Sequence, residues 1–198
     1  AILVEKPVLS NLRQLSRAIS DLEDKLWVSS PLRQMESFGF FESYLASRTR
    51  EIVQATIVCK SNLDLWRPER DPNKGYWGSR SQGGILRELV HELDYADFLF
   101  KDLKLVSAKL ERSAKYSFLA PSKAELSLLS GGVINVSVHL NWATEQEERF
   151  CEVVIGRETV LWDVLSGTVS ETKCGKNSVI HRAYSSRDAL LASQLQFC

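Results

Sequence analysis

The side chains most often used in catalysis and metal binding are few and scattered in this sequence. The histidines are His91, His139 and His181, and the cysteines are Cys59, Cys151, Cys174 and Cys198. No His-x-x-x-His pair and no Cys-x-x-Cys pair occurs, so the spacing expected of a metal site is absent. We therefore expect no metal and no cofactor. We also expect reduced cysteines packed as small apolar groups, which favours the cytosol or the nucleus.

Short motifs for nucleophilic or phosphate chemistry are equally weak. The Gly83-Gly84 pair precedes a predicted helix, but it lacks the preceding strand, the lysine and the spacing of a phosphate-binding loop. Ser-Gly-Gly at positions 130–132 lies in a predicted hairpin and not before a helix. The acidic residues Glu145, Glu147 and Glu148 are typical of a solvated loop. These patterns predict a protein without catalytic residues, that is, not an enzyme.

One loop combines aromatic and charged residues. Segment 67–83 contains two prolines and three glycines, which predict a loop. Aromatic and arginine side chains often dominate protein interfaces. We therefore predict a partner-binding site formed by Trp66, Arg67, Arg70, Tyr76 and Trp77. In the alternative, which is the more common case, such rings fold back onto the domain and only hold the loop in place.

Composition excludes some classes of protein. The 198 residues include 25 basic and 25 acidic side chains, so the formal net charge is zero. A neutral chain lacks the basic field of a dedicated nucleic-acid binder, and no nucleic-acid partner is expected. No apolar run is long enough to span a membrane. The first residue is Ala and not Met, which indicates a piece of a larger chain.

Two segments have the apolar spacing of helices. The first stripe supports a helix over residues 7–27, and it consists of Leu9, Leu12, Leu15, Ile19, Leu22 and Leu26. The second stripe predicts one long helix over residues 85–111, and it consists of Leu86, Leu89, Leu93, Ala96, Phe100 and Leu103. No Gly or Pro lies between Gly84 and Pro121, and therefore nothing in this interval is expected to break the helix.

The second half of the chain changes to the spacing of strands. In residues 133–142 the apolar side chains alternate with polar ones, which predicts a half-buried strand. The apolar face consists of Ile134, Val136, Val138, Leu140 and Trp142, and we expect it to face the helix 85–111. Further strands are predicted at 116–119, 124–129 and 150–155, and one or two within 50–66. Helices at 158–165 and 186–197 close the chain. The predicted fold class is α+β, with helices on an antiparallel sheet.

This order of elements, a long helix, a four-stranded antiparallel meander and two closing helices, is that of an RWD domain. The segments LRELVHELDYADFLFKDLKLV (86–106), AELSLLSGGVINVSVHLNW (124–142) and RFCEVVIG (149–156) resemble the C-terminal RWD region of the blinkin-type outer-kinetochore scaffold family. The segment VQATIVCKSNLDLW (53–66) resembles the lead-in to that region. The tyrosine-proline element of many RWD domains is missing, and ATEQEE (143–148) takes its place.

The resemblance implies an RWD-like domain at 84–198. Residues 1–83 would then hold the N-terminal helix, short strands and the aromatic loop, and a tandem pair would need them to form a reduced first RWD copy. It also implies a non-catalytic module at the kinetochore, in the nucleus, that docks onto the Mis12 assembly as its partner. Two alternatives stay open, an RNA-binding or silencing-suppressor protein and an enzyme with an uncommon site.

Overall fold

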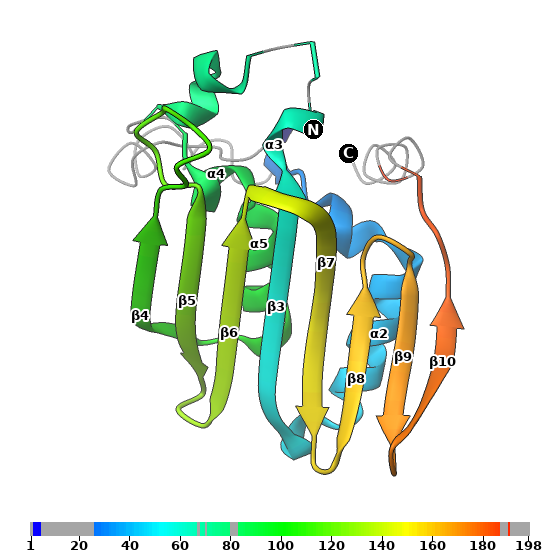
Figure 1. Cartoon of the computed structure of the whole chain (residues 1–198). Coiled ribbons are helices and arrows are strands. Elements are labelled where there is room, and N and C mark those ends of the chain that lie inside the picture. Colours follow the sequence, from blue (N-terminus) through cyan, green and yellow to red (C-terminus); the bar gives the residue numbers. More distant parts are fainter. Residues whose placement is uncertain are drawn as a thin grey trace.

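The computed structural model describes residues 2–4, 26–66, 68–69, 71–79, 83–186 and 190. Its centre is a mixed eight-stranded sheet with the strand order β10-β9-β8-β7-β3-β6-β5-β4 (Figure 1). The strands are β3 (Ile52–Asn62), β4 (Leu103–Glu111), β5 (Lys123–Ser130), β6 (Ile134–Asn141), β7 (Ala143–Ile155), β8 (Glu158–Asp163), β9 (Thr168–Lys173) and β10 (Lys176–Arg182). A separate two-stranded parallel sheet pairs β1 (Ile2–Val4) with β2 (Leu26–Val28).

The central strand of the large sheet comes from the first third of the chain. β3 lies between β6, to which it is parallel, and β7, to which it is antiparallel. The other neighbours in this sheet pair antiparallel. Ile57 of β3 is thereby opposite Val138 on one side and Cys151 on the other. Residues that sequence order separates widely are thus adjacent in the middle of the sheet.

Helices cover one face of this sheet. α2 (Glu36–Ala46) and α5 (Val90–Phe100) lie behind the sheet in Figure 1, and the opposite face carries no described helix. Apolar side chains alternate along the strands, so one set points to the helices and forms the core. Trp162 of β8 is at its centre, where its ring lies 5.1 Å from that of Phe38 and 5.4 Å from that of Tyr95. All three rings are buried.

Several strands agree with the sequence. The segments predicted at 124–129, 133–142 and 150–155 fall within or largely within β5, β6 and β7, which confirms them. The predicted hairpin at 130–132 joins β5 to β6, and Gly131 and Gly132 both have positive φ, at 53° and 78°. Such values suit a tight hairpin turn. The predicted apolar face is also confirmed, because Val136, Val138 and Leu140 are buried.

The long helix predicted over 85–111 is wrong. The chain instead forms a short helix α4 (Ile85–Glu88), the helix α5 and the strand β4. Leu89, with φ −98° and ψ 33°, separates α4 from α5. Lys101 and Asp102 then take positive φ of 50° and 44°, which ends the helix. β4 is an outer strand of the sheet, and its pairing with β5 overrides the local helical spacing.

Other expectations about the elements also need correction. The predicted strand at 116–119 is a loop in which Tyr116 and Phe118 stack with ring centroids 5.1 Å apart. The predicted helix at 158–165 is the strand β8 with its following turn, and ATEQEE belongs to β7. Residues 26–28 form β2, so the predicted helix 7–27 is wrong there, and its residues 7–25 lie outside the described residues. The predicted helix at 186–197 also lies mostly outside them. The RWD order of helix, meander and two helices is therefore wrong.

The remaining described elements are short. They are α3 (Leu63–Trp66) and the 3-10 helices η3 (Pro31–Gln34), η4 (Thr49–Glu51), η5 (Pro72–Lys74) and η6 (Tyr76–Gly78). Among the described helices, none has both the length and the apolar character that crossing a membrane requires.

Candidate active site

One edge of the sheet gathers elements that commonly form a ligand site. The parallel strands β3 and β6 both end there, at Asn62 and Asn141, and the N-terminal end of α5 lies at the same edge (Figure 1). In open α/β sheets, ligands bind outside the carboxyl ends of the parallel strands, and β3 and β6 form a parallel pair of this kind. We define this region, with α4 and the first turn of α5, as the candidate edge.

The Gly83-Gly84 pair fixes where α4 begins. The Gly84 N–H donates to the carbonyl of Trp77 at 2.7 Å, and the Ile85 N–H donates to the carbonyl of Pro121 at 3.1 Å. A Cβ at Gly83 would lie 2.2 Å from the Trp77 carbonyl oxygen, and Gly84 has φ +101°. Only glycine allows this close approach of backbones. The pair therefore has a packing role, which accounts for the motif without a bound phosphate.

A buried ion pair joins α5 to the sheet at this edge. The carboxylate of Glu92 is fully buried, and its Oε1 lies 2.6 Å from Nε of Arg149 on β7. Burial disfavours the charged guanidinium, but the negative charge of Glu92 outweighs it and raises the pKa of Arg149. The second oxygen, Oε2, has no hydrogen-bond partner within the described residues. This charge-assisted contact thus anchors the first turn of α5 to β7.

The other polar groups around this ion pair are inert. Burial raises the pKa of the Cys59 thiol to about 12, with a further contribution from the charge of Glu92. Burial also raises the pKa values of Cys151 and Tyr95. A thiol that stays protonated is a poor nucleophile. Cys59 and Cys151 are free and buried, as the sequence predicted, and they offer no nucleophile at neutral pH.

His91 lies in the first turn of α5 at this edge. It is half-buried. Asp94 follows one turn later and is ion-paired with Arg33 at 3.0 Å. The other histidines lie elsewhere, His139 on the uncovered face of β6 and His181 stacked on a ring of α2 at 4.4 Å. Among the histidines, only His91 belongs to the candidate edge.

The structure places two of the five predicted partner-binding residues together. Trp77 is 6% exposed, and its Nε1–H donates to the Pro72 carbonyl at 2.6 Å. Tyr76 is 53% exposed, and its hydroxyl donates to Glu88 at 3.2 Å. The Trp66 side chain and the whole of Arg67 and Arg70 lie outside the described residues. Trp77 therefore holds the loop in place, whereas Tyr76 presents its ring to solvent.

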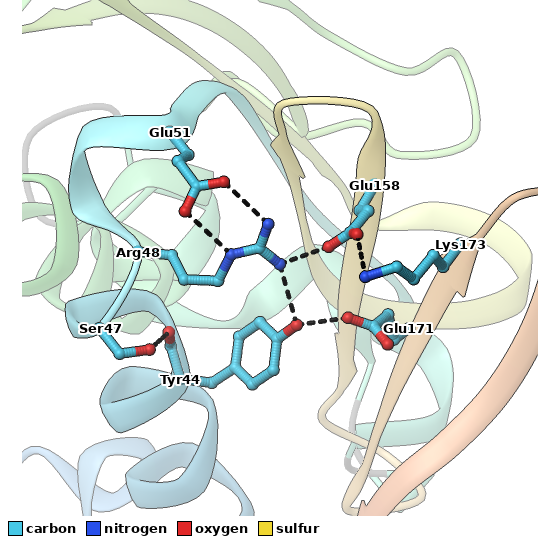
Figure 2. A network of polar contacts seen from close by, with 7 residues as sticks. All are labelled: Tyr44, Ser47, Arg48, Glu51, Glu158, Glu171 and Lys173. Carbon is cyan, nitrogen blue, oxygen red and sulfur yellow. Dashed lines mark hydrogen bonds and ion pairs between the residues drawn. The ribbon is translucent and has the colours of Figure 1, made fainter.

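A second polar cluster lies at the opposite end of the sheet, where β8 begins. Figure 2 shows the Arg48 guanidinium between Glu51, Glu158 and the Tyr44 hydroxyl. Lys173 pairs with Glu158, and the Tyr44 hydroxyl donates to Glu171. Bonds from Lys173 and Arg48 lower the pKa of Glu158, and those from Glu51 and Glu158 raise the pKa of Arg48. Because every charge here has a partner, we assign this cluster to fastening α2 onto β8 and β9.

Sequence reasoning missed both polar clusters. Their members are far apart in the chain, and Glu92 and Arg149 are 57 positions apart. One signal was available, because Glu92 lies between Leu89 and Ala96 on the stripe predicted to be buried. A carboxylate on an apolar stripe needs a buried partner. The sequence could not say which partner. Within the described residues no cluster of His, Cys, Asp or Glu could hold a metal ion.

Comparison with known proteins identifies the fold. No protein-family model and no curated protein matches this sequence. An oxidoreductase from Agrobacterium radiobacter, solved with NAD+, L-tartaric acid and magnesium, has a TM-score of 0.75 and 17% identity, covering 98% of this chain and 59% of that one. The D-galactose-1-dehydrogenase of Rhizobium etli has a TM-score of 0.73 and 16% identity, covering 98% and 60%. UDP-N-acetylglucosamine 3-dehydrogenase of Acidithiobacillus ferrooxidans has a TM-score of 0.71 and 13% identity, covering 96% and 58%.

The chain thus shares its fold with part of these oxidoreductases, and it spans about three fifths of their length. The resemblance to the C-terminal RWD region of the kinetochore scaffold is wrong. Three expectations that depended on it are also wrong, because the neighbours are bacterial enzymes. They are the Mis12 assembly as partner, the adaptor role, and the localisation at the kinetochore in the nucleus. The alternative of an RNA-binding protein or silencing suppressor has no support among them. The expectation of a non-enzyme is also overturned, because these neighbours are oxidoreductases.

Proposed function

We propose that this chain is the substrate-side part of an NAD(P)-dependent oxidoreductase that acts on a hydroxyl group of a sugar-type substrate. The observation that carries the proposal is the likeness of its fold to oxidoreductases over 96–98% of this chain. The names of two of these neighbours, a D-galactose dehydrogenase and a UDP-N-acetylglucosamine dehydrogenase, support a sugar as the substrate class.

The described residues do not fit the pyrophosphate of a dinucleotide cofactor. Such a pyrophosphate lies on a glycine-rich turn between a strand and a helix of a parallel sheet. In the described part of the large sheet, β3 and β6 form the parallel pair, and β3 runs directly into the four-residue helix α3, which contains no glycine. The Gly83-Gly84 pair packs against the loop around Trp77. We therefore assign the described residues to the substrate side of the reaction.

Oxidation of an alcohol releases the hydroxyl proton, and a general base has to accept it. Histidine is the side chain most suited to this exchange near neutral pH. The carboxylates beside His91 are engaged by arginines, Glu92 by Arg149 and Asp94 by Arg33. These contacts fix the first turn of α5 and with it the position of His91. We therefore assign His91 as the general base.

The test is a dehydrogenase assay on the protein in its natural length. NAD+ and NADP+ are each offered with a panel of aldoses, anhydrosugars and nucleotide sugars, and the absorbance of the reduced nicotinamide is followed. We expect one cofactor to be reduced with at least one sugar. His91→Ala is expected to lower kcat by about 10²–10⁴, the usual contribution of a general base.

His139→Ala is the matched control, because His139 lies on the uncovered face of β6, and it should leave kcat unchanged. Failure of every sugar with both cofactors would reject the proposed function. A fully active His91→Ala enzyme would reject the role of His91 and leave the function standing.

A further inference from the structure

A hollow of about 340 Å³ lies beside the aromatic loop. Its lining residues are Asp71, Lys74, Gly75, Tyr76 and Trp77. This volume is within the range of small-molecule sites. The hollow borders the candidate edge, because the hydroxyl of its lining residue Tyr76 donates to Glu88 at the end of α4. It is therefore placed to receive a part of a ligand that extends from that edge.

The walls of the hollow are held firmly. Asn73 accepts hydrogen bonds from the Ser117 N–H at 2.7 Å and from its hydroxyl at 3.0 Å, which ties η5 to the loop after β4. The Trp77 Nε1–H donates to the Pro72 carbonyl, and the Trp77 and Tyr76 rings pack edge to face with their centroids 5.4 Å apart. A Cβ on Gly75 would lie 1.9 Å from the Trp77 ring, so glycine is required there. A preformed wall of this kind lowers the entropy lost on binding.

The chemistry of the lining suits a neutral, polyhydroxylated ring. Tyr76 is more than half exposed, and the negative quadrupole of an aromatic ring attracts the C–H groups of a sugar ring. The Asp71 carboxylate accepts the Asn73 N–H at 2.9 Å, and that bond lowers its pKa, so it remains an acceptor for hydroxyl groups at neutral pH. Lys74 lies 3.5 Å from Asp71, and therefore the charges of the described lining cancel.

We infer that this hollow is a subsite for a sugar ring, which stacks on Tyr76 and donates hydroxyl hydrogen bonds to Asp71. The inference rests on the proposed function and adds the place at which part of the substrate is held. The ring of Tyr76 supplies the attraction, and the carboxylate of Asp71 selects for hydroxyl groups.

The test measures binding without any cofactor, so that it does not depend on hydride transfer. Saturation-transfer NMR and calorimetry are run on the protein with D-galactose, D-glucose, D-mannose, N-acetylglucosamine and levoglucosan as probes. We expect at least one to bind. Tyr76→Ala should weaken that binding at least tenfold, as for loss of an aromatic anchor, and Tyr76→Phe should retain most of it. Asp71→Asn should weaken it by about threefold to tenfold, because a neutral acceptor forms weaker hydrogen bonds.

Tyr184→Ala is the matched control, because Tyr184 is 74% exposed and lies outside the hollow. Its binding should equal that of the wild type, and the melting temperatures of the Tyr76 variants should stay within a degree or two. The inference is overturned if no probe binds, if Tyr76→Ala binds as wild type, or if Tyr184→Ala loses as much. Sugar binding that depends on Tyr76 without dehydrogenase activity would reject the proposed function alone, whereas activity with an unchanged KM in Tyr76→Ala would reject the subsite alone.

Discussion

Replacement of Arg149 by Met should destabilise the protein strongly. Glu92 is fully buried, its Oε1 is bound to Arg149 at 2.6 Å, and Oε2 has no described partner. Without the guanidinium, a carboxylate remains in the core with no opposite charge. Loss of one partner of a buried ion pair costs about 3–5 kcal/mol. That is a large share of the roughly 5–15 kcal/mol by which a protein is stable.

The assay is thermal and urea unfolding of the variant and the wild type. For a chain of this length, each kcal/mol corresponds to about 2–4 °C in Tm, and therefore a loss of about 6–20 °C is expected. The double variant Glu92→Leu with Arg149→Met should recover most of the stability, because an apolar pair leaves no charge in the core.

Lys60→Met provides the matched control. Lys60 of β3 and Glu148 of β7 lie opposite each other in the sheet and form an ion pair at 2.8 Å. Their side chains are 38% and 39% exposed. An exposed ion pair contributes only about 0–1 kcal/mol. The reasoning is refuted if Arg149→Met melts within about 2 °C of the wild type, or if Lys60→Met costs as much as Arg149→Met.

Three further predictions follow from burial and charge. Val136→Asp should abolish folding, because Val136 is fully buried, whereas Ser137→Asp on the uncovered face should fold, as circular dichroism would show. Ion pairs with Lys173 and Arg48 lower the pKa of Glu158 below its usual 4.5. These ion pairs therefore stabilise the folded protein above pH ~4.5, and this stabilisation is lost as the pH falls through the lowered pKa. Glu158→Gln should therefore reduce the drop in Tm between pH 6 and pH 3, and an equal drop would contradict this. Iodoacetamide at pH 8 should label the exposed Cys174 in the native protein and leave the buried Cys59, with its pKa of about 12, unlabelled until unfolding. Mass spectrometry of native Cys59 carrying the label would contradict this.

The strands in the second half show what local pattern could determine. Residues 134–141 alternate between apolar and polar side chains, and β6 has that register in the structure. The same alternation was present in β8, where Val160 and Trp162 are buried, but the short apolar run there was taken for a helix. A run of this length is compatible with either element. Only pairing with β7 and β9 decides in favour of a strand.

The sequence predicted little of the candidate site. The sequence predicts a partner-binding site at the loop with Tyr76 and Trp77, and this use of the loop stays a prediction. The sequence did not single out His91, because a lone histidine on a helix carries no spacing signal. Its position at the carboxyl ends of β3 and β6 depends on where α5 crosses the sheet.

The sequence by itself determined the strand β5, the alternation of β6 and the turn between them. These depend on side-chain period and glycine conformation, which are local properties. The tertiary structure decided that residues 103–111 form β4, that β3 lies between β6 and β7, and that Arg149 meets Glu92. Each of these depends on pairing between distant segments, and that pairing can outweigh the preference of any single segment. The resemblance to the RWD domain failed for this reason, because it relied on the order of elements, and two stretches predicted as helical, 103–111 and 158–163, are the strands β4 and β8.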